Sequence, residues 1–296
     1  MVKKIPVIVE TDNIFNSDKS MNRLSYFFTV LTSSSIFIAL NGMIVTMISS
    51  MLYEVGAKTN ILVVAFLATF SAYNMNKITD KVEDSINSPP PVPRGPLQII
   101  IPSIMALTLC FMLSLSLGAD ALVIITTSFV VSILYSIKLT GFFPRFKEIM
   151  GLKSILVASS WAFTGALLPA ISQNVGRERI LLTFTYIFIQ ILVNTILCDI
   201  RDINGDLVSG VKTVPIVLGI DKTKKLLIII NSLMLPWLIY CLMNDLFSRF
   251  IPALFGSMIY GYLIIEAFAR KRCNRLLVEL IVDGEWIPLF IFMVLL

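Results

Sequence analysis

The chain has 296 residues, of which 56% are hydrophobic and only 15% are charged. Soluble domains carry about 25% charged residues, so this composition excludes an ordinary soluble protein of this length and indicates a polytopic membrane protein. The formal net charge is +5 and the chain contains no histidine, which excludes histidine ligands for zinc or haem and a histidine general base.

Apolar stretches of membrane-spanning length recur along the whole chain, each near the roughly 20 residues that a helix needs to cross the hydrocarbon core. In chain order they lie at 27–50, 60–76, 97–117, 120–137, 149–171, 180–198, 226–243, 250–268 and 278–296. The last stretch is the weakest, because Asp283, Gly284, Glu285 and Pro288 interrupt it, and we expect it to be truncated, tilted or re-entrant. The pattern predicts an all-α fold with about nine transmembrane helices.

The predicted spans form one transmembrane domain at 26–296, preceded by a polar arm at 1–25. Helices 1–4 occupy about 26–137 and helices 5–9 about 149–296. The arm lacks the apolar core of a cleavable signal peptide, so the first span is expected to act as its own insertion signal. The four cysteines have neither metal-ligand spacing nor an extracellular pair, and we expect free thiols.

Basic residues are distributed unevenly between the two sides of this topology. The arm and the connections after spans 2, 4, 6 and 8 carry 20 of the 24 Lys and Arg, and only Lys58, Arg177, Arg179 and Arg249 fall on the other side. Basic connections stay in the cytoplasm, so the N-terminus and these four connections are predicted to be cytoplasmic, in a multi-pass protein of the cell membrane. The positive charge is therefore a topology signal and does not indicate nucleic-acid binding.

Two short polar clusters follow the second and sixth spans. The first consists of Asn76, Asp80 and Asp84, and the second of Asp199, Asp202 and Asp206. Spacings of three and four residues place each set on one face of a helix end, outside the packed core, where like charges repel unless a cation separates them. Magnesium takes one or two carboxylates and leaves positions for phosphate oxygens. The clusters therefore predict two halves of a metal-diphosphate site.

The spacing of the clusters indicates an internal repeat. Asp80 and Asp202 are separated by the same number of residues as Asp84 and Asp206, and each cluster follows the second helix of a run of four. This pattern predicts two four-helix pseudo-repeats around a central cavity, whose matching acidic ends converge near the axis that relates them.

The two clusters together resemble the motifs of a known family. Asn-x-x-x-Asp-x-x-x-Asp after the second span, Asp-x-x-Asp-x-x-x-Asp after the sixth, and the segment from Gly205 to Pro215 are similar to those of the UbiA superfamily of intramembrane aromatic prenyltransferases, over nearly the whole chain. The resemblance implies a barrel-like helical bundle with a central cavity. It also implies Mg²⁺-dependent transfer of a prenyl chain from its diphosphate to a lipophilic acceptor.

The resemblance also implies roles for the clustered residues. The implied catalytic carboxylates are Asp80, Asp84, Asp202 and Asp206, and the implied metal ligands are these four together with Asn76 and Asp199. Asn76 can bind metal or a phosphate oxygen without adding repulsion, whereas Asp199 either binds metal or holds a Lys or Arg in place. The alternative is that the acids merely pair, as solvated loop charges, with Lys77, Lys81, Arg201 and Lys212.

Cations for the diphosphate are expected in the neighbouring connections. Relatives usually carry Tyr-x-x-x-Lys after the fourth span; here Tyr135 is followed by Lys138, one position early, so Lys147 or Lys153 is the alternative. Two further candidates are Arg94, near the position of an Asn-x-x-x-Arg-Pro element, and Lys212. Otherwise, Arg94 and Lys138 are ordinary cytoplasmic basic residues.

The predicted function is thus an intramembrane prenyltransferase whose partners are a prenyl diphosphate donor, a lipophilic acceptor and membrane lipid, with no nucleic acid. The acceptor remains open between a hydroxybenzoate, a naphthoate, a chlorin, haem and a glycerol phosphate ether. The alternative is a transporter or binding protein for prenyl diphosphates or related anionic lipids. A transporter site would be expected near the membrane midplane, whereas both clusters lie at helix ends.

Overall fold

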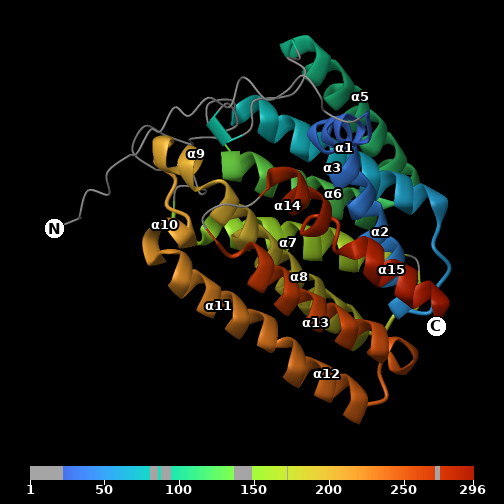
Figure 1. Cartoon of the computed structure of the whole chain (residues 1–296). Helices are drawn as coiled ribbons and strands as arrows, with labels where there is room; N and C mark the ends of the chain where they lie inside the picture. The colour runs from blue at the N-terminus through green and yellow to red at the C-terminus, as the bar shows by residue number, and fades with distance from the viewer. Residues whose placement is uncertain (1–22, 81–85, 88–94, 137–148, 172, 271–273) are drawn as a thin grey trace.

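The chain folds into a bundle of α-helices (Figure 1). The computed structural model describes residues 23–80, 86–87, 95–136, 149–171, 173–270 and 274–296, and these contain no β-strand. The helices, in chain order, are α1 (Arg23–Ser33), α2 (Ile36–Leu52), α3 (Thr59–Thr79), α5 (Pro96–Leu117), α6 (Ala119–Ser136), α7 (Leu152–Leu167), α8 (Arg177–Arg201), α9 (Ile203–Val208), α10 (Val214–Leu218), α11 (Ile220–Ser232), α12 (Met234–Met243), α13 (Ile251–Phe268), α14 (Arg275–Ile281) and α15 (Trp286–Leu295). Short 3₁₀ turns at Leu168–Ala170 and Ser248–Phe250 follow α7 and precede α13.

Several helices have the length and composition needed to cross a membrane. The described residues contain 6 such helices, or up to 7 if the bent pair α1 and α2 is one span. Large apolar side chains project from the bundle, as on α5, where Leu97, Met105, Met112 and Leu115 are exposed. An exposed apolar surface of this kind suits a hydrocarbon environment, in which only a helix that satisfies its own backbone hydrogen bonds is stable. The chain is therefore built as a multi-pass membrane protein.

The first and last predicted spans differ from continuous helices. The stretch at 27–50 is broken between α1 and α2, whose axes are bent by 67°. Ser35 at the break adopts a left-handed conformation, with φ of 66°, and the Lys77 ammonium donates to the Ser33 carbonyl and the Ser35 hydroxyl. The last stretch is divided into α14 and α15 by a turn that contains Asp283 and Glu285. Hydropathy indicates the second of these breaks, through Asp283 and Glu285, but not the first, where apolar residues continue on both sides of Ser35.

Helix α8 occupies the centre of the bundle and packs most extensively on α7. Small residues on α7 allow this close approach, since Ala158, Ala162 and Ala166 are fully buried. At Gly165 an added Cβ would lie 2.7 Å from Val45 and 3.1 Å from Ile187, so only glycine fits between α2 and α8. This packing fixes the positions of α7 and α8 relative to each other, and with them the polar residues near the start of α7 and the end of α8.

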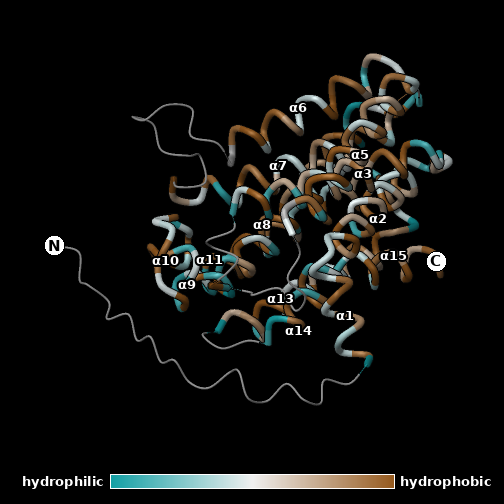
Figure 2. Tube along the Cα trace, turned by 90° about the horizontal axis from the view of Figure 1, so that it is seen from above, coloured by the Kyte–Doolittle hydropathy of each residue, from teal (hydrophilic) through white to brown (hydrophobic). Residues whose placement is uncertain are grey.

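Polar residues concentrate away from the middle of the long helices. In Figure 2 the long helices are mainly hydrophobic, whereas hydrophilic segments are visible near α9 and α14. Helix α9 directly follows α8, and α14 also packs against α8. The second acidic cluster therefore lies where the apolar part of the bundle ends.

Candidate functional site

A cavity of about 250 Å³ lies within the bundle, among α2, α3, α6, α7 and α8. One end is polar and is lined by Asn76, Lys153, Asp199, Arg201 and Asp202. The rest is lined mainly by small and apolar groups, which include Val45, Ala65, Ala68, Phe129, Val157 and Gly165. Along α7 the lining extends from Lys153 to Gly165, or roughly 18 Å at 1.5 Å per residue. The cavity thus joins a charged end to a long apolar limb.

Asp199 and Asp206 converge on one lysine. The Lys153 ammonium lies 2.9 Å from Asp199 Oδ1, and 3.1 and 3.0 Å from the two carboxylate oxygens of Asp206. The Ser154 hydroxyl donates to the other Asp199 oxygen at 2.8 Å. Both carboxylates are buried. The expectation that the acids stand outside the packed core is therefore wrong for these two, because α7 packs over the end of α8 and covers them.

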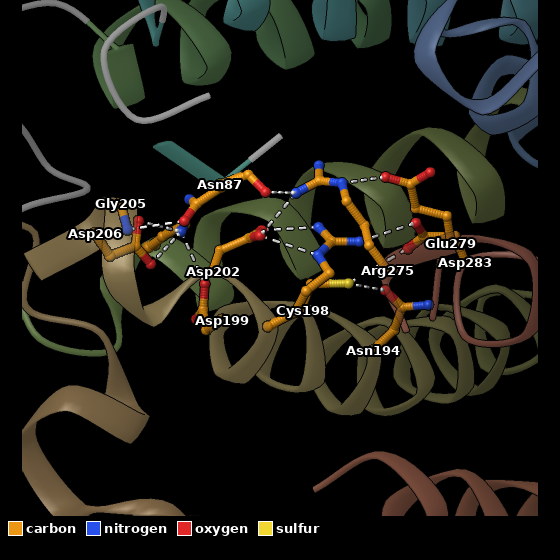
Figure 3. A network of polar contacts seen from close by, with 12 residues as sticks. Asn87, Asn194, Cys198, Asp199, Asp202, Gly205, Asp206, Arg275, Glu279 and Asp283 are labelled. Carbon is orange, nitrogen blue, oxygen red and sulfur yellow. Dashed lines mark hydrogen bonds and ion pairs between the residues drawn. The ribbon is translucent and has the colours of Figure 1, made fainter. Parts of the chain in front are cut away.

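Two arginines hold Asp202, which ends α8 and precedes α9 (Figure 3). Arg201 Nε and Nη2 donate to its two oxygens at 3.0 and 2.8 Å, and Arg275 Nη1 lies 3.4 Å from Oδ1. A carboxylate at a helix C-terminus faces the negative end of the helix dipole, which these cations offset. Burial raises the pKa of Asp202, but the neighbouring Arg201 and Arg275 outweigh it and hold that pKa below the usual value. Asp202 is thus held ionised.

Asp206 behaves differently from Asp202. Its burial raises the pKa from 3.8 to about 7, although the Lys153 ammonium acts in the opposite direction and Asp199 adds to the rise. Among the described residues, Asp206 shares its one cation, Lys153, with Asp199, whereas two arginines contact Asp202. Asp206 therefore carries a less well compensated charge, which an additional cation would stabilise.

Asn87 connects the segment after α3 to α9 and α14. Its side-chain oxygen accepts a hydrogen bond from the Gly205 N–H at 2.8 Å, and its carbonyl accepts one from Arg275 at 3.0 Å. A Cβ on Gly205 would lie 2.3 Å from Asn87 Nδ2, so glycine permits the close approach. The same arginine thus contacts both Asn87 and Asp202, as Figure 3 shows.

The donor set at this end fits a hard divalent cation. Among the described residues no group of three or more His, Cys, Asp or Glu side chains is already arranged to hold a metal ion. However, the network joins five carboxylates to the three cations Lys153, Arg201 and Arg275. Lys153 shows that Asp199 and Asp206 can share one positive charge. Oxygen donors with surplus negative charge are what Mg²⁺ prefers.

The structure brings some of the predicted residues together. Asn76 from α3 lines the same cavity as Asp199 and Asp202, which places parts of both clusters at one site. Asp80 ends α3, where its Oδ1 accepts a hydrogen bond from Thr79. Lys212 is exposed between α9 and α10 and does not line the cavity. Lys153, the alternative to Lys138, lies among the acids.

Other predicted residues lie outside the part of the chain that the structure describes. These are Asp84, Arg94, Lys138 and the other alternative lysine, Lys147. Tyr135 belongs to the last turn of α6, and its side chain is likewise outside the description. Their roles stay predictions.

Sequence reasoning gave no functional role to one carboxylate of the cavity. Asp283 lies in the turn between α14 and α15 and lines the cavity. Its oxygens lie 3.5 Å from the Cys198 thiol and 3.9 Å from Arg201 Nη1. One signal in the sequence could have identified it. Asp283 is an ionisable residue within an apolar stretch, and such a residue is a candidate functional residue by default. The hydropathy pattern by itself identifies Asp283 only as an interruption of the last span.

Comparison with known proteins assigns this chain to a family. The UbiA prenyltransferase family matches residues 27–291, and the chain belongs to this family. A digeranylgeranylglyceryl phosphate synthase of Saccharolobus solfataricus is 31% identical over 189 residues, which cover 61% of this chain and 63% of that protein. The synthase of the same name from Methanosphaera stadtmanae is 29% identical over 189 residues, covering 61% of this chain and 62% of that protein. The chain thus spans less than two thirds of the length of these curated relatives.

Solved structures share the fold over nearly the whole chain. A UbiA homologue from Archaeoglobus fulgidus bound to GPP and Mg²⁺ has a TM-score of 0.68 at 13% identity, covering 90% of this chain and 100% of that one. An apo homologue from Aeropyrum pernix K1 has a TM-score of 0.66 at 12% identity, covering 88% and 99% of the two chains. A structure described for digeranylgeranylglyceryl phosphate synthase has a TM-score of 0.60 at 18% identity, covering 92% and 98%. At these identities the likeness shows the fold alone.

Proposed function

We propose that this protein is a Mg²⁺-dependent intramembrane prenyltransferase that moves an isoprenoid chain from a prenyl diphosphate to a lipophilic acceptor. The observation that carries the proposal is the shape and polarity of the cavity, whose charged end continues into a long apolar limb. A prenyl diphosphate has the same two-part character. Membership of the UbiA prenyltransferase family supports the proposal.

The polar end provides groups for the diphosphate. Asn76, Asp80, Asp199, Asp202 and Asp206 would hold Mg²⁺, together with Asp84 of the first cluster. The ion, when bound, neutralises the negative charge that builds on the departing pyrophosphate. A UbiA homologue of the same fold was solved bound to GPP and Mg²⁺, which supports a metal requirement.

Cationic side chains at the same end would bind the phosphate oxygens directly. Lys153 and Arg201 both line the cavity there, and Arg201 Nη1 has no hydrogen-bond partner among the described residues. Arg94, Lys138, Tyr135 and Lys212 remain further candidates for this role. A diphosphate at this end would therefore meet fixed positive charge from side chains that also pair with the acids.

The apolar limb would bind the prenyl chain and exclude water from the allylic cation that forms when the carbon–oxygen bond of the donor breaks. Tyr73, Phe129 and Trp161 contribute aromatic groups to its lining, and Tyr73 packs edge-on against Trp161 with 6.3 Å between ring centroids. Aromatic faces attract cations, so they can stabilise the allylic cation next to the diphosphate.

The placement in the cell follows from the charge distribution. We propose about nine transmembrane helices in two four-helix pseudo-repeats, within one domain at 26–296 that follows a cytoplasmic arm at 1–25. The acidic clusters would face the cytoplasm from the cell membrane, because the basic connections accompany them. Prenyl diphosphates would then enter from the cytoplasmic side.

The alternative function is a transporter or binding protein for prenyl diphosphates or related anionic lipids. The similarity to proteins named digeranylgeranylglyceryl phosphate synthase favours the enzyme. These relatives also favour a glycerol phosphate ether as the acceptor class among those considered.

The proposal is tested with purified protein in detergent, labelled geranyl and geranylgeranyl diphosphates, and a panel of acceptors, with Mg²⁺ or with EDTA. We expect a prenylated product with at least one acceptor, and none with EDTA. Glu266→Gln, on the exposed part of α13, is the matched carboxylate control and should retain wild-type activity. Stable donor binding that is unchanged by EDTA, with no product and no release of prenyl alcohol, would instead identify a binding protein or transporter.

A further inference from the structure

One carboxylate of the cavity is separate from both acidic clusters. Asp283 comes from the turn between α14 and α15, yet its side chain reaches the cavity that α3 and α8 line. Its side chain keeps 20% exposure, whereas the neighbouring residues Val282 and Glu285 are buried. A carboxylate in an apolar bundle costs free energy unless it has hydrogen-bond partners, so such a group is a candidate ligand-binding residue.

The partners of Asp283 leave its carboxylate free to accept hydrogen bonds. The Cys198 thiol approaches Oδ1 at 3.5 Å, and a thiol is a weak donor. Arg201 Nη1 is 3.9 Å from Oδ2, beyond hydrogen-bond distance. The same guanidinium uses Nε and Nη2 on Asp202. Asp283 therefore has a cation close by but no strong donor among the described residues.

The arginine also separates Asp283 from the proposed metal ligands. Arg201 bonds Asp202 on one side and approaches Asp283 on the other. A fixed positive charge between the two carboxylates disfavours a metal ion that would bind both. At the same time, only the Arg201 guanidinium separates Asp283 from Asp202, where the diphosphate is proposed to bind. A group bound to Asp283 would therefore lie beside the first carbon of a prenyl chain.

A small void of about 10 Å³ adjoins the cavity at Asp283. It is lined by Ile38, Tyr73, Trp161, Ile191, Asn194, Thr195, Asp283 and Trp286. Tyr73, Trp161, Asn194, Thr195 and Asp283 line both this void and the main cavity. If the donor tail occupies the long limb toward Ala65 and Phe129, as proposed above, Asp283 in the wall of the same cavity is left for the second substrate.

We propose that Asp283 binds the acceptor, by accepting a hydrogen bond from a neutral hydroxyl group and taking its proton during transfer. This inference rests on the proposed prenyltransferase function. In the reaction, the bond between the first prenyl carbon and the diphosphate oxygen breaks, and its electron pair leaves with pyrophosphate. The acceptor oxygen forms the new bond to that carbon, and the hydroxyl proton moves to the Asp283 carboxylate. The proposal selects acceptors with an alcohol or phenol here and disfavours those that present a carboxylate, which Asp283 would repel.

The test uses one variant to distinguish ionisation of the prenyl donor from transfer of the prenyl chain to the acceptor. Asp283→Asn keeps the size of the side chain but removes its charge and basicity. The probes are labelled geranylgeranyl diphosphate with Mg²⁺, and a geranylgeranyl ether of glycerol phosphate that bears a free hydroxyl. We expect transfer to fall about 100-fold, the low end for loss of a general base. Release of geranylgeraniol without acceptor should stay within about threefold of wild type, as should affinity for the unreactive thiolodiphosphate analogue. Glu266→Gln serves as the control.

Wild-type protein provides a second measurement if the variant does not fold. The same acceptor with its hydroxyl replaced by hydrogen should bind about 10- to 100-fold more weakly, as expected for loss of a hydrogen bond to a charged group. Equal binding of the two acceptors would overturn the proposal, as would wild-type transfer by Asp283→Asn or a parallel loss of its donor affinity. If wild-type protein neither transfers nor ionises the donor, the proposed function itself is wrong.

Discussion

Two buried acids share one lysine, and we predict that removing this lysine lowers the stability of the protein. In Lys153→Met, Asp199 and Asp206 keep their burial, with side chains only 3% and 5% exposed, but lose the ammonium between them. Removing one partner of a fully buried pair costs about 3–5 kcal/mol. Because Lys153 is 20% exposed and Asp206 can accept a proton, we expect a loss of about 2–3 kcal/mol in the free energy of unfolding.

The measurement is chemical unfolding of the purified protein at pH 8, in detergent with EDTA. Lys224→Met is the matched control, since Lys224 lies 2.8 Å from Glu266, whose side chain is 75% exposed. An exposed pair of this kind contributes about 0–1 kcal/mol, so the control should differ little from wild type. Mg²⁺ should stabilise Lys153→Met more than wild type, because the ion can take over the position of the ammonium between the acids.

Two results would refute this reasoning. A loss in Lys153→Met no larger than that in Lys224→Met would mean that the acids do not depend on the lysine. An equal response of Lys153→Met and wild type to Mg²⁺ would mean that these acids do not hold the metal.

Four further predictions concern the other parts of the site. Asp202→Asn should lower the transfer rate at least about 100-fold while the protein stays folded, because the amide oxygen still accepts from the neighbouring arginine; unchanged turnover would remove this residue from the mechanism. Asn87→Ala and Gly205→Ala should each weaken donor binding several-fold and be non-additive in the double variant, since both disrupt one contact; additive effects in equilibrium binding would contradict this. Ala68→Phe should raise KM for geranylgeranyl diphosphate by about tenfold but not KM for dimethylallyl diphosphate, because Ala68 lines the long limb; equal effects on both donors would show that the tail lies elsewhere. The pKa of Asp206 is raised from 3.8 to about 7, so in EDTA its contribution to stability is present at low pH and is lost as the pH rises through about 7. Between pH 5 and 8, the unfolding free energy of Asp206→Asn should therefore fall less than that of wild type.

The sequence by itself determined the class of protein and the general location of the site. Membrane crossing depends on the hydropathy of each segment, which the neighbouring helices do not change. Asn76 and Asp202 were predicted to act at one site because they follow equivalent spans, and they line one cavity. The resemblance to the UbiA prenyltransferases depended on the same local motifs, and the family match confirms it.

The tertiary structure decided which charged side chains contact one another. Lys153 contacts Asp206 because α7 packs on α8, and no local pattern at either residue shows this contact. The same packing buries Asp199, which its position at a helix end did not suggest. The break between α1 and α2 likewise depends on Lys77, which reaches it from α3.

Asp283 shows most clearly what the sequence alone did not determine. In the sequence it interrupts an apolar stretch, which marks it as a candidate functional residue but does not show which residues it contacts. In the structure the turn before α15 brings it beside Cys198 and Arg201 of α8, in the wall of the cavity. Hydropathy and motif spacing are properties of neighbouring residues, so the sequence determines them directly. A cavity is formed by residues distant in the chain, so its members are known only once the helices are packed.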